Sequence, residues 1–210
     1  MAVHELSARV PAHAQRPERS FYPVWILLTT LCIPTAFVLD LAVLRLIIDS
    51  VGDYIYVDGV RHITEDYLGV PIFIPIAGLL TGLLQYALLR RYLPRMGWWV
   101  LATLVGWILG YLLIAIPDRV GWTDALLKNI ALMFLVMGLS IGLAQWLLLR
   151  GRLPQAGWWI AANILGWGLL GLVTSDNSVG QLGLVVIGLF PACTTGAALA
   201  WLMSRLRGTE

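Results

Sequence analysis

Long apolar runs alternate with short polar segments along the chain, and this alternation predicts the elements of the fold. Six of the runs are long enough, at about 1.5 Å per helical residue, to cross a bilayer core of roughly 30 Å. We therefore expect an all-α fold, a polytopic membrane bundle of six transmembrane helices that occupies residues 24–204. The six runs are Val24–Ile48, Pro71–Leu89, Trp98–Ile116, Ala125–Leu149, Trp158–Val173 and Leu182–Met203.

Residues 78–107 and 138–167 repeat one another without a gap, with identical residues at 16 of the 30 aligned positions. Both copies contain a Gly-x-x-x-Gly pair, a glutamine, an elbow with an arginine and a Leu-Pro step, and a Gly-Trp-Trp start of the next run. An internal repeat indicates an architecture built from one structural unit. We expect two helical hairpins, residues 78–116 and 138–173, with closely packed glycine faces.

The last and first runs hold parts of a third copy of this pattern. If the matches reflect one unit, residues 182–204 and residues 24–48 form a third hairpin that is split by the chain ends. The bundle then has approximate threefold symmetry about the membrane normal. The matches are Trp201 and Arg205 with Trp146 and Arg150, and residues 25–29 with residues 99–103.

Lysine and arginine are concentrated in alternate polar segments. The segments on one side of the expected bundle carry ten, and those on the other side carry three, namely Arg61, Arg119 and Lys128. Because basic residues accumulate in cytoplasmic segments, we expect both termini in the cytoplasm. Residues 1–23 are polar and proline-containing, and we expect them to form a disordered cytoplasmic tail.

Residues 49–70 form the expected extracytoplasmic loop, which holds five acidic residues and one arginine. Within it, YIYV and VRHI flank Asp58-Gly59, a sequence typical of a β-hairpin with a type I′ turn. Thr64, Glu65 and Asp66 then resemble the cap of a short helix that leads back into the bilayer. An ordered lid or docking surface and a solvated loop are both consistent with this segment.

The composition supports a membrane protein and argues against a catalytic one. The chain is 59% hydrophobic and 12% charged, with a mean hydropathy of +0.81. The two cysteines form no CxxC pattern, and the three histidines lie outside the apolar runs, so we expect no metal site. No HExxH motif, Ser/His pair or carboxylate cluster lies in the expected spans. We therefore expect no enzyme activity, and no nucleic-acid partner.

Two glutamines are the most informative polar residues in the spans. Gln85 and Gln145 each precede an elbow arginine by five residues, so both lie about 7–8 Å inside the membrane interface. Thr103 and Asn163 lie at a similar depth on the returning helices. We expect Gln85 to bond Thr103 and Gln145 to bond Asn163, one bond across each hairpin. The functional alternative is that the glutamines converge on a polar pocket for a headgroup, a quinone or a pigment.

Three further residues are candidates for ligand binding or for packing. Trp107 and Trp167 fall near the middle of the membrane, where a buried indole packs on a neighbour or a ligand and its N–H prefers a partner. Asp40 is an ionisable residue in the first span, and such residues are functional candidates by default. It lies roughly 24 Å along that helix, close to the outer interface, where an interfacial role is the alternative.

The paired pattern GLxxGLxQWxLLRxxxPxxGWWxxAxxxGW resembles an uncharacterised family of bacterial multi-span membrane proteins, found in filamentous phototrophic bacteria and cyanobacteria. The resemblance covers spans two to five. It implies a multi-pass helical bundle in the bacterial cytoplasmic (inner) membrane, and it implies no activity, site or cofactor.

Two classes of function are consistent with these observations. The first is a non-catalytic accessory or structural subunit of a larger membrane complex, or a module of it that binds lipid, quinone or a carotenoid- or chlorophyll-type pigment. Its partners would be membrane lipids and other membrane-protein subunits or further copies of itself. The alternative is a small transporter or channel built from parallel hairpin repeats. Transporters usually have charged residues well inside several spans, and the expected spans of this chain lack them.

Overall fold

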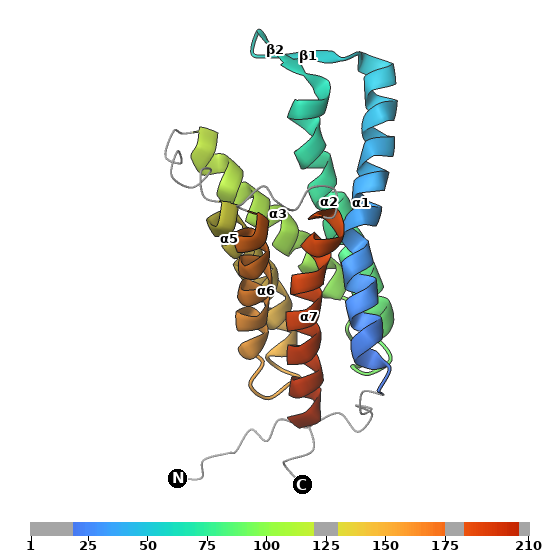
Figure 1. Cartoon of the computed structure of the whole chain (residues 1–210), viewed down its shortest axis with the longest axis vertical. Helices are drawn as coiled ribbons and strands as arrows, with labels where there is room; N and C mark the ends of the chain where they lie inside the picture. Colours follow the sequence, from blue (N-terminus) through green and yellow to red (C-terminus); the bar gives the residue numbers. More distant parts are fainter. Residues whose placement is uncertain (1–18, 120–129, 175–182, 206–210) are drawn as a thin grey trace, which may run out of the picture.

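The computed structural model of the chain describes residues 19–119, 130–174 and 183–205. These residues form six helices and one two-stranded sheet, so the expected all-helical architecture is confirmed (Figure 1). In chain order the elements are α1 (Phe21–Val51), β1 (Tyr54–Val57), β2 (Val60–Ile63), α2 (Thr64–Leu89), α3 (Trp99–Arg119), α5 (Ile130–Leu149), α6 (Trp158–Thr174) and α7 (Gly183–Ser204).

Four of these helices are long and apolar enough to cross a membrane, namely α1, α2, α5 and residues Ile187–Ser204 of α7. The apolar stretches of α3 and α6, Trp99–Ala115 and Trp158–Thr174, are shorter. These lengths and compositions are those of an integral membrane protein. A crossing by all six helices and the cytoplasmic position of both termini stay predictions. Residues 1–18, 125–129 and 206–210, part of the expected tails and fourth span, lie outside the described residues.

Helix α2 begins seven residues before the start that the sequence indicated. A helix begins at Thr64, as expected, but it is not a short separate helix, because α2 runs unbroken from Thr64 through Pro71 and Pro75. Proline is tolerated inside membrane helices because neighbouring groups can satisfy the carbonyls that it leaves free. The Thr64 hydroxyl does not cap the helix. It donates to the Gly52 carbonyl at 2.8 Å and joins the start of α2 to the end of α1.

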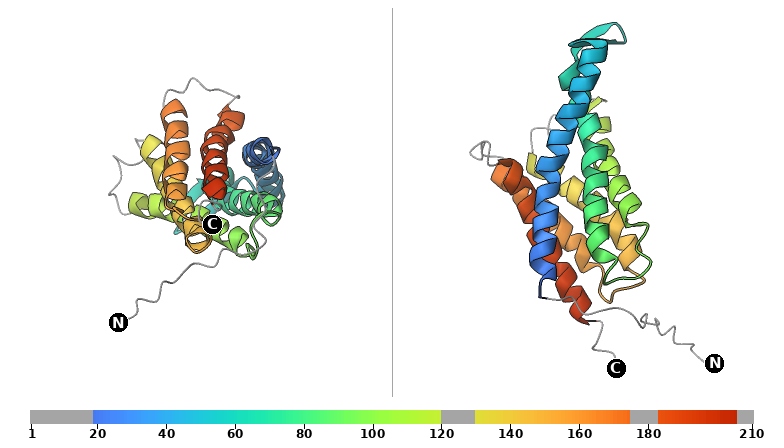
Figure 2. Two further views of the ribbon diagram at one scale, coloured as in Figure 1. Left: turned by 90° about the horizontal axis from the view of Figure 1, so that it is seen from below. Right: turned by 90° about the vertical axis from the view of Figure 1, so that its right-hand side faces the viewer.

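The six helices form a closed ring. Each helix packs against its neighbours in the order α1, α2, α3, α5, α6 and α7, and α7 packs against α1. The view from below in Figure 2 shows this ring with α7 beside α1. Helices α1 and α7, which are the furthest apart in sequence, are therefore adjacent in space, as a split third hairpin requires.

The glycine pairs bring the two helices of each hairpin close together. A Cβ atom added at Gly82 would lie 2.9 Å from the Val100 Cα of α3, and one added at Gly142 would lie 3.2 Å from the Ile160 Cα of α6. Only glycine permits backbones to approach this closely, which is how helices gain contact area in lipid. The expected close packing of the glycine faces is confirmed.

The two elbows, residues 90–98 and 150–157, have the same backbone geometry. Arg95 and Gln155, which are sixty positions apart, have φ angles of 59° and 57°. The amide of Leu93 bonds the Leu89 carbonyl at 2.8 Å, and the equivalent bond from Leu153 measures 2.9 Å. Both elbows turn buried side chains towards the axis of the ring. We call this end of the ring the elbow end.

An apolar cluster closes the ring at its elbow end. It joins side chains of all six described helices with those of the two elbows and includes three tryptophans that are wholly buried. A second cluster occupies the middle of the ring, around Trp107 and Trp167. The first cluster consists of Phe21, Trp25, Leu88, Leu89, Tyr92, Leu93, Met96, Trp99, Leu149, Leu153, Ala156, Trp159, Leu199, Leu202 and Met203.

Helices α1 and α2 continue together beyond the other four helices and carry the hairpin at their tip (Figure 1). The 31 residues of α1 span about 46 Å, well beyond a bilayer core of roughly 30 Å. Strands β1 and β2 pair antiparallel, with Val57 opposite Val60. Asp58 and Gly59 both have positive φ, 51° and 78°, so the expected type I′ hairpin is confirmed. We call residues 45–70 the arm.

Candidate functional site

Gln85 and Gln145 lie inside the ring, on α2 and α5. Gln85 is seven residues after Gly78 and three after Gly82, so it shares the inward face of its helix with the glycine pair. Gln145 has the same relation to its own glycine pair. Their exposed fractions are 5% and 1%. A buried amide requires partners for both its oxygen and its nitrogen, and both glutamines have them.

Gln145 connects three helices through its amide. Its Nε2 donates to the Thr103 hydroxyl of α3 at 2.9 Å and to the Gln85 Oε1 of α2 at 3.3 Å. Its Oε1 accepts a hydrogen bond from the Trp159 indole of α6 at 3.0 Å. Because an indole N–H can only donate, Trp159 fixes the orientation of the amide and turns Nε2 towards α3.

Gln85 repeats this arrangement one hairpin earlier. Its Oε1 accepts a hydrogen bond from the Trp99 indole at 3.1 Å, and its Nε2 lies 3.4 Å from the Thr29 hydroxyl of α1. In both copies the donating tryptophan follows the glutamine by fourteen residues. The amide nitrogen bonds a threonine on the helix before the hairpin. The glutamines therefore join successive hairpins to one another.

The expected hydrogen bonds within each hairpin are wrong. Gln145 bonds Thr103 and not Asn163, whose Nδ2 donates instead to the Trp159 carbonyl of its own helix at 2.9 Å. Thr103 likewise donates to the Trp99 carbonyl at 2.8 Å and does not bond Gln85. The physical reason is the indole, which occupies the oxygen of each glutamine from the returning helix and directs the nitrogen to the neighbouring hairpin.

We call Gln85, Gln145 and the threonines that they contact, Thr29 and Thr103, the polar layer. Three buried tryptophans surround it, and none of them was singled out from the sequence for this role. Trp25, Trp99 and Trp159 each have 0% exposure and lie on α1, α3 and α6. The Trp159 ring meets the Trp25 ring at 6.1 Å and the Trp99 ring at 5.7 Å, both edge to face. Trp25 donates to Thr195 of α7 at 3.1 Å, in the part of the ring where the glutamine of the pattern is absent.

The Gly-Trp-Trp motif contained a signal that identifies these tryptophans. Successive helical residues point about 100° apart, so only one tryptophan of a pair can face lipid. Trp98 and Trp158 are 67% and 62% exposed, as expected for an interfacial belt, whereas the second member of each pair is buried. The first member of each pair is thus available to a membrane interface, and the second member faces the interior of the ring.

The polar layer borders a small cavity on the axis of the ring. The cavity has a volume of about 30 Å³ and is lined by residues from all six described helices, among them Thr29, Gln85, Trp107 and Gln145. This volume suits one or two water molecules. It is far below the roughly 300 Å³ at which small-molecule pockets begin. The cavity therefore has no room for a quinone or a pigment.

Trp107 and Trp167 form the opposite wall of this cavity. Their rings pack edge to face at 5.2 Å, and both residues are buried. A Cβ atom added at Gly78 would lie 3.0 Å from the Trp107 Cβ, and one at Gly138 would lie 2.9 Å from the Trp167 Cβ. Each tryptophan thus packs over the first glycine of its own hairpin. The Trp107 Nε1 has no acceptor among the described residues.

The structure brings five of the six sequence candidates together and leaves one apart. Gln85, Gln145, Asn163, Trp107 and Trp167 all line the axial cavity. The sixth candidate, Asp40, does not line this cavity. No residue that lines the cavity is ionisable, and the described residues hold no group of His, Cys, Asp and Glu that could bind a metal. This layer can therefore exchange hydrogen bonds, but it supplies no acid, base or nucleophile at ordinary pH.

Asp40 lies elsewhere on α1. It is eleven residues beyond Thr29, about 16 Å along the helix, and it is 5% exposed between the buried residues Ala36 and Leu44. Its Oδ1 has no hydrogen-bond partner among the described residues. Asp40 does not belong to the polar layer, and no second ionisable group of the described chain pairs with it.

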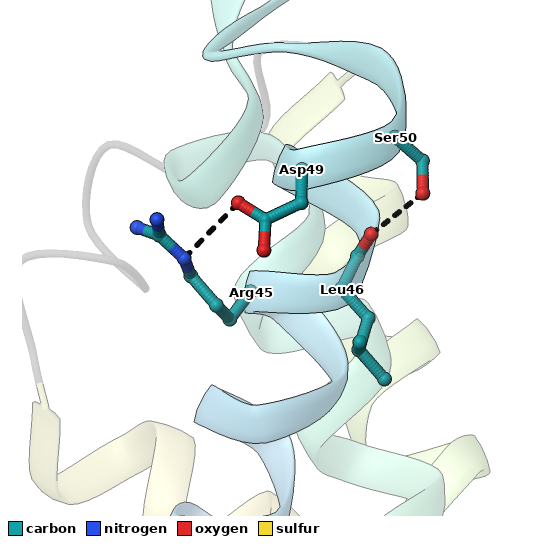
Figure 3. A network of polar contacts seen from close by, with 4 residues as sticks. All are labelled: Arg45, Leu46, Asp49 and Ser50. Atoms are coloured by element: carbon teal, nitrogen blue, oxygen red, sulfur yellow. Dashed lines mark hydrogen bonds and ion pairs between the residues drawn. The ribbon is translucent and has the colours of Figure 1, made fainter.

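The arm presents a second candidate surface, of a different kind. Arg45 Nε and Asp49 Oδ1 lie 3.1 Å apart on α1, with side chains 75% and 55% exposed, and the Ser50 hydroxyl bonds the Leu46 carbonyl (Figure 3). Apolar side chains are exposed on the same part of the chain. They are Leu46 at 68%, Val51 at 55%, Tyr54 at 46%, Tyr56 at 72%, Val60 at 56%, Ile63 at 50% and Val70 at 54%.

Comparison with known proteins adds no further constraint. No protein-family model, no curated protein and no solved structure matches this chain. The function is therefore argued from the geometry of the polar layer and the arm.

Proposed function

We propose that this chain is a non-catalytic integral membrane protein that serves as an accessory or structural subunit of a larger membrane complex. It crosses the bacterial cytoplasmic membrane six times, with the elbow end and both termini in the cytoplasm. Its arm extends on the other side and docks a partner subunit. The exposed apolar surface of the arm is the observation that carries this proposal.

The ion pair of Arg45 and Asp49 supports a position of the arm outside the bilayer core. Both side chains are more than half exposed, and such charges require water or headgroups around them. Leu46 and Val51 lie within two residues of this pair on the same helix, so the proposed position puts them outside the hydrocarbon as well. By the register of the hairpin, Tyr54, Tyr56 and Ile63 share one of its faces, and exposed apolar side chains on one water-exposed face are typical of a protein interface.

The charge of the arm indicates the chemistry of the partner. Asp53, Asp58, Glu65 and Asp66 outnumber Arg61 on the hairpin and the start of α2. Arg61 also lies over the Tyr54 ring, with its Cζ 3.5 Å from the ring centroid. A partner with apolar side chains and a basic rim complements this surface. The proposed partner is a membrane-protein subunit with such a face outside the bilayer.

The interior of the ring supports a scaffold role. The glutamine amides have partners for both their atoms, and the buried cluster at the elbow end closes the axis below them. These groups stabilise the association of the helices and supply no reactive chemistry. The ring thus holds α1 and α2 at a fixed position, from which the arm reaches its partner.

Site-specific photo-crosslinking in the native membrane tests the proposal. A photoreactive amino acid replaces Tyr56 at the tip of the arm, and a second variant carries it at Trp98, which is also exposed but lies at the elbow end. We expect one protein adduct at position 56 and lipid adducts at position 98. Lipid adducts or no adduct at position 56 would contradict the docking role of the arm.

The transporter or channel alternative rests on one observation, the axial cavity that all six described helices line. Proteoliposomes that contain the purified chain alone discriminate between the two functions. The subunit proposal expects no solute flux above that of protein-free vesicles. A flux that disappears in a Gln145→Leu variant would favour the transporter and overturn the scaffold role.

A further inference from the structure

The outer surface of the ring carries an apolar groove between α6 and α7. The groove has a volume of about 490 Å³, and Trp158 and Trp201 border it at the elbow end with their rings 6.4 Å apart. A second hollow, of about 450 Å³, shares Trp158 and Ala161 with the groove and reaches Gln155 of the elbow. Volumes of this size lie in the range of roughly 300–1,000 Å³ that is typical of small-molecule sites.

Corresponding positions elsewhere in the ring carry larger side chains. In the repeat, positions of α6 correspond to positions of α3. Positions of α7 correspond in the same way to those of α5, because an arginine follows a tryptophan by four residues in both and lies over its ring. The Arg205 Cζ is 5.0 Å from the Trp201 centroid, and the Arg150 Cζ is 5.4 Å from the Trp146 centroid. In this correspondence two alanines and a threonine at the α6–α7 interface replace three leucines of the α3–α5 interface. The pairs are Ala161 for Leu101, Ala198 for Leu143 and Thr194 for Leu139.

The interface between α1 and α2 has leucines at these positions as well. By the same correspondence, Leu27, Leu79 and Leu83 occupy them, and they are 57%, 45% and 46% exposed on the outer surface of the ring. The α6–α7 groove is therefore produced by a local change of three side chains to smaller ones. Packing of the ring does not explain the change, because leucine is accommodated at the corresponding interfaces.

The lining of the groove selects an apolar occupant. Thr194 donates its hydroxyl to the Phe190 carbonyl of its own helix at 3.0 Å, so this donor is already used within α7. Leu165 and Ala161 are exposed on the same outer surface. In a membrane this surface faces lipid, and an extended hydrocarbon chain fits a groove of this shape and chemistry.

The elbow end of the groove adds polar groups suited to a phosphate. The guanidinium of Arg205 lies over the ring of Trp201, which lines the groove, and Gln155 lines the adjoining hollow. Arginine binds phosphate oxygens through a charged, forked donor. We propose that this groove is a specific site for one anionic phospholipid, with an acyl chain between α6 and α7 and its phosphate near Arg205. The site is separate from the arm and does not depend on the docking role of the arm.

Native mass spectrometry of the detergent-purified chain tests the site with phosphatidylglycerol and phosphatidylcholine as probes. The variant Ala161→Leu/Ala198→Leu introduces the side chains of the α3–α5 interface and should weaken phosphatidylglycerol binding about tenfold or more, because it occupies the space of several methylenes. Arg205→Gln should reduce the preference for phosphatidylglycerol over phosphatidylcholine about fivefold, the effect of one cation near an anionic headgroup. Unchanged binding in the filled variant would overturn the proposal.

A second measurement does not depend on the variants. Phosphatidylglycerol with a photoreactive group on its acyl chain labels the wild-type chain, and the labelled peptides are mapped by mass spectrometry. Labels concentrated on α6 and α7 near Ala161 and Ala198 support the site. Labels spread evenly over the outer surfaces of all six helices would show ordinary annular lipid and overturn it.

Discussion

The ring and the arm differ in the burial of their polar and apolar side chains. Inside the ring, each glutamine amide has an indole donor and a hydroxyl partner, and large apolar side chains such as Trp99 and Trp159 are fully buried. On the arm, charged side chains pair at the surface, and apolar residues such as Tyr56 and Val60 are more than half exposed.

This difference separates stability from function. Groups that are buried and bonded stabilise the fold, so changes to them should alter the free energy of unfolding. Exposed apolar groups contribute little to an isolated chain and are retained when another molecule covers them. The comparison therefore assigns stability to the ring and partner binding to the arm, and substitutions in each region can separate the two.

The largest effect is expected in the polar layer. Gln145→Leu removes hydrogen bonds to Trp159, Thr103 and Gln85 and should lower the free energy of unfolding by about 2–4 kcal/mol, since interhelical bonds in membranes contribute roughly 0.6–2 kcal/mol each. Detergent-induced unfolding in mixed micelles measures the change. A double-mutant cycle with Trp159→Phe should show coupling of about 1 kcal/mol, whereas a cycle with Asn163→Ala should show almost none. Equal coupling in the two cycles would contradict the assigned bonds.

A matched pair of glycines compares the two regions directly. A Cβ atom at Gly188 of α7 would lie 2.7 Å from the Thr30 Cα of α1, whereas one at Gly69 on the arm meets nothing within 4 Å. Gly188→Ala should destabilise the chain by about 1–3 kcal/mol because α1 and α7 must move apart. Gly69→Ala should be neutral or stabilising by up to about 1 kcal/mol through helix propensity. The same unfolding assay measures both, and a tolerated Gly188→Ala would argue against the closed ring.

Relief of backbone strain at Gln155 should stabilise the chain, by less than the losses described above. Gln155 has a φ of 57° in the second elbow. This conformation is less favourable for a residue with a Cβ atom than for glycine. Gln155→Gly should raise the free energy of unfolding by roughly 0.5–1 kcal/mol. Asp58→Gly in the type I′ turn of the arm is the control and should change it by less than about 0.5 kcal/mol, because aspartate suits that turn. A destabilised Gln155→Gly variant would show that the side chain has a role at the elbow.

The smallest effects on stability are expected on the arm. Arg45→Ala removes an exposed ion pair of α1, and pairs of this kind contribute about 0.3–0.5 kcal/mol. The loss should decrease further at high salt concentration, because exposed charges are screened. Unfolding at low and high salt measures it. A loss above 1 kcal/mol would indicate that the arm contributes to the folding of the ring.

The sequence allowed the helices and the hairpin to be predicted because their signals are local. Apolar runs, glycine pairs and Asp58-Gly59 each determine structure within a few residues, and the repeat indicated hairpins with a common elbow. The partners of Gln85 and Gln145 could not be predicted in the same way. The indole of Trp99 or Trp159 bonds the amide oxygen, and the helix that the amide nitrogen then reaches is determined by tertiary packing.

The start of α2 shows a second limit of local reasoning. Pro71 is a frequent helix boundary, yet α2 continues through it to Thr64, which is held by the Gly52 carbonyl at the end of α1. This hydrogen bond joins two segments that are twelve residues apart, and local signals do not predict such a contact. The unbroken α2 lengthens the arm, so the surface proposed to bind a partner was only partly evident from the sequence.

Quantitative co-purification tests the division between ring and arm most directly. The wild-type chain and a Tyr56→Ser/Val60→Ser variant are purified in mild detergent from the native membrane, and the protein crosslinked at position 56 is measured in each. The account predicts a stoichiometric partner with the wild type and its loss from the variant, at a free energy of unfolding that changes by less than about 0.5 kcal/mol. Equal recovery of that protein with both chains would contradict the docking role of the arm.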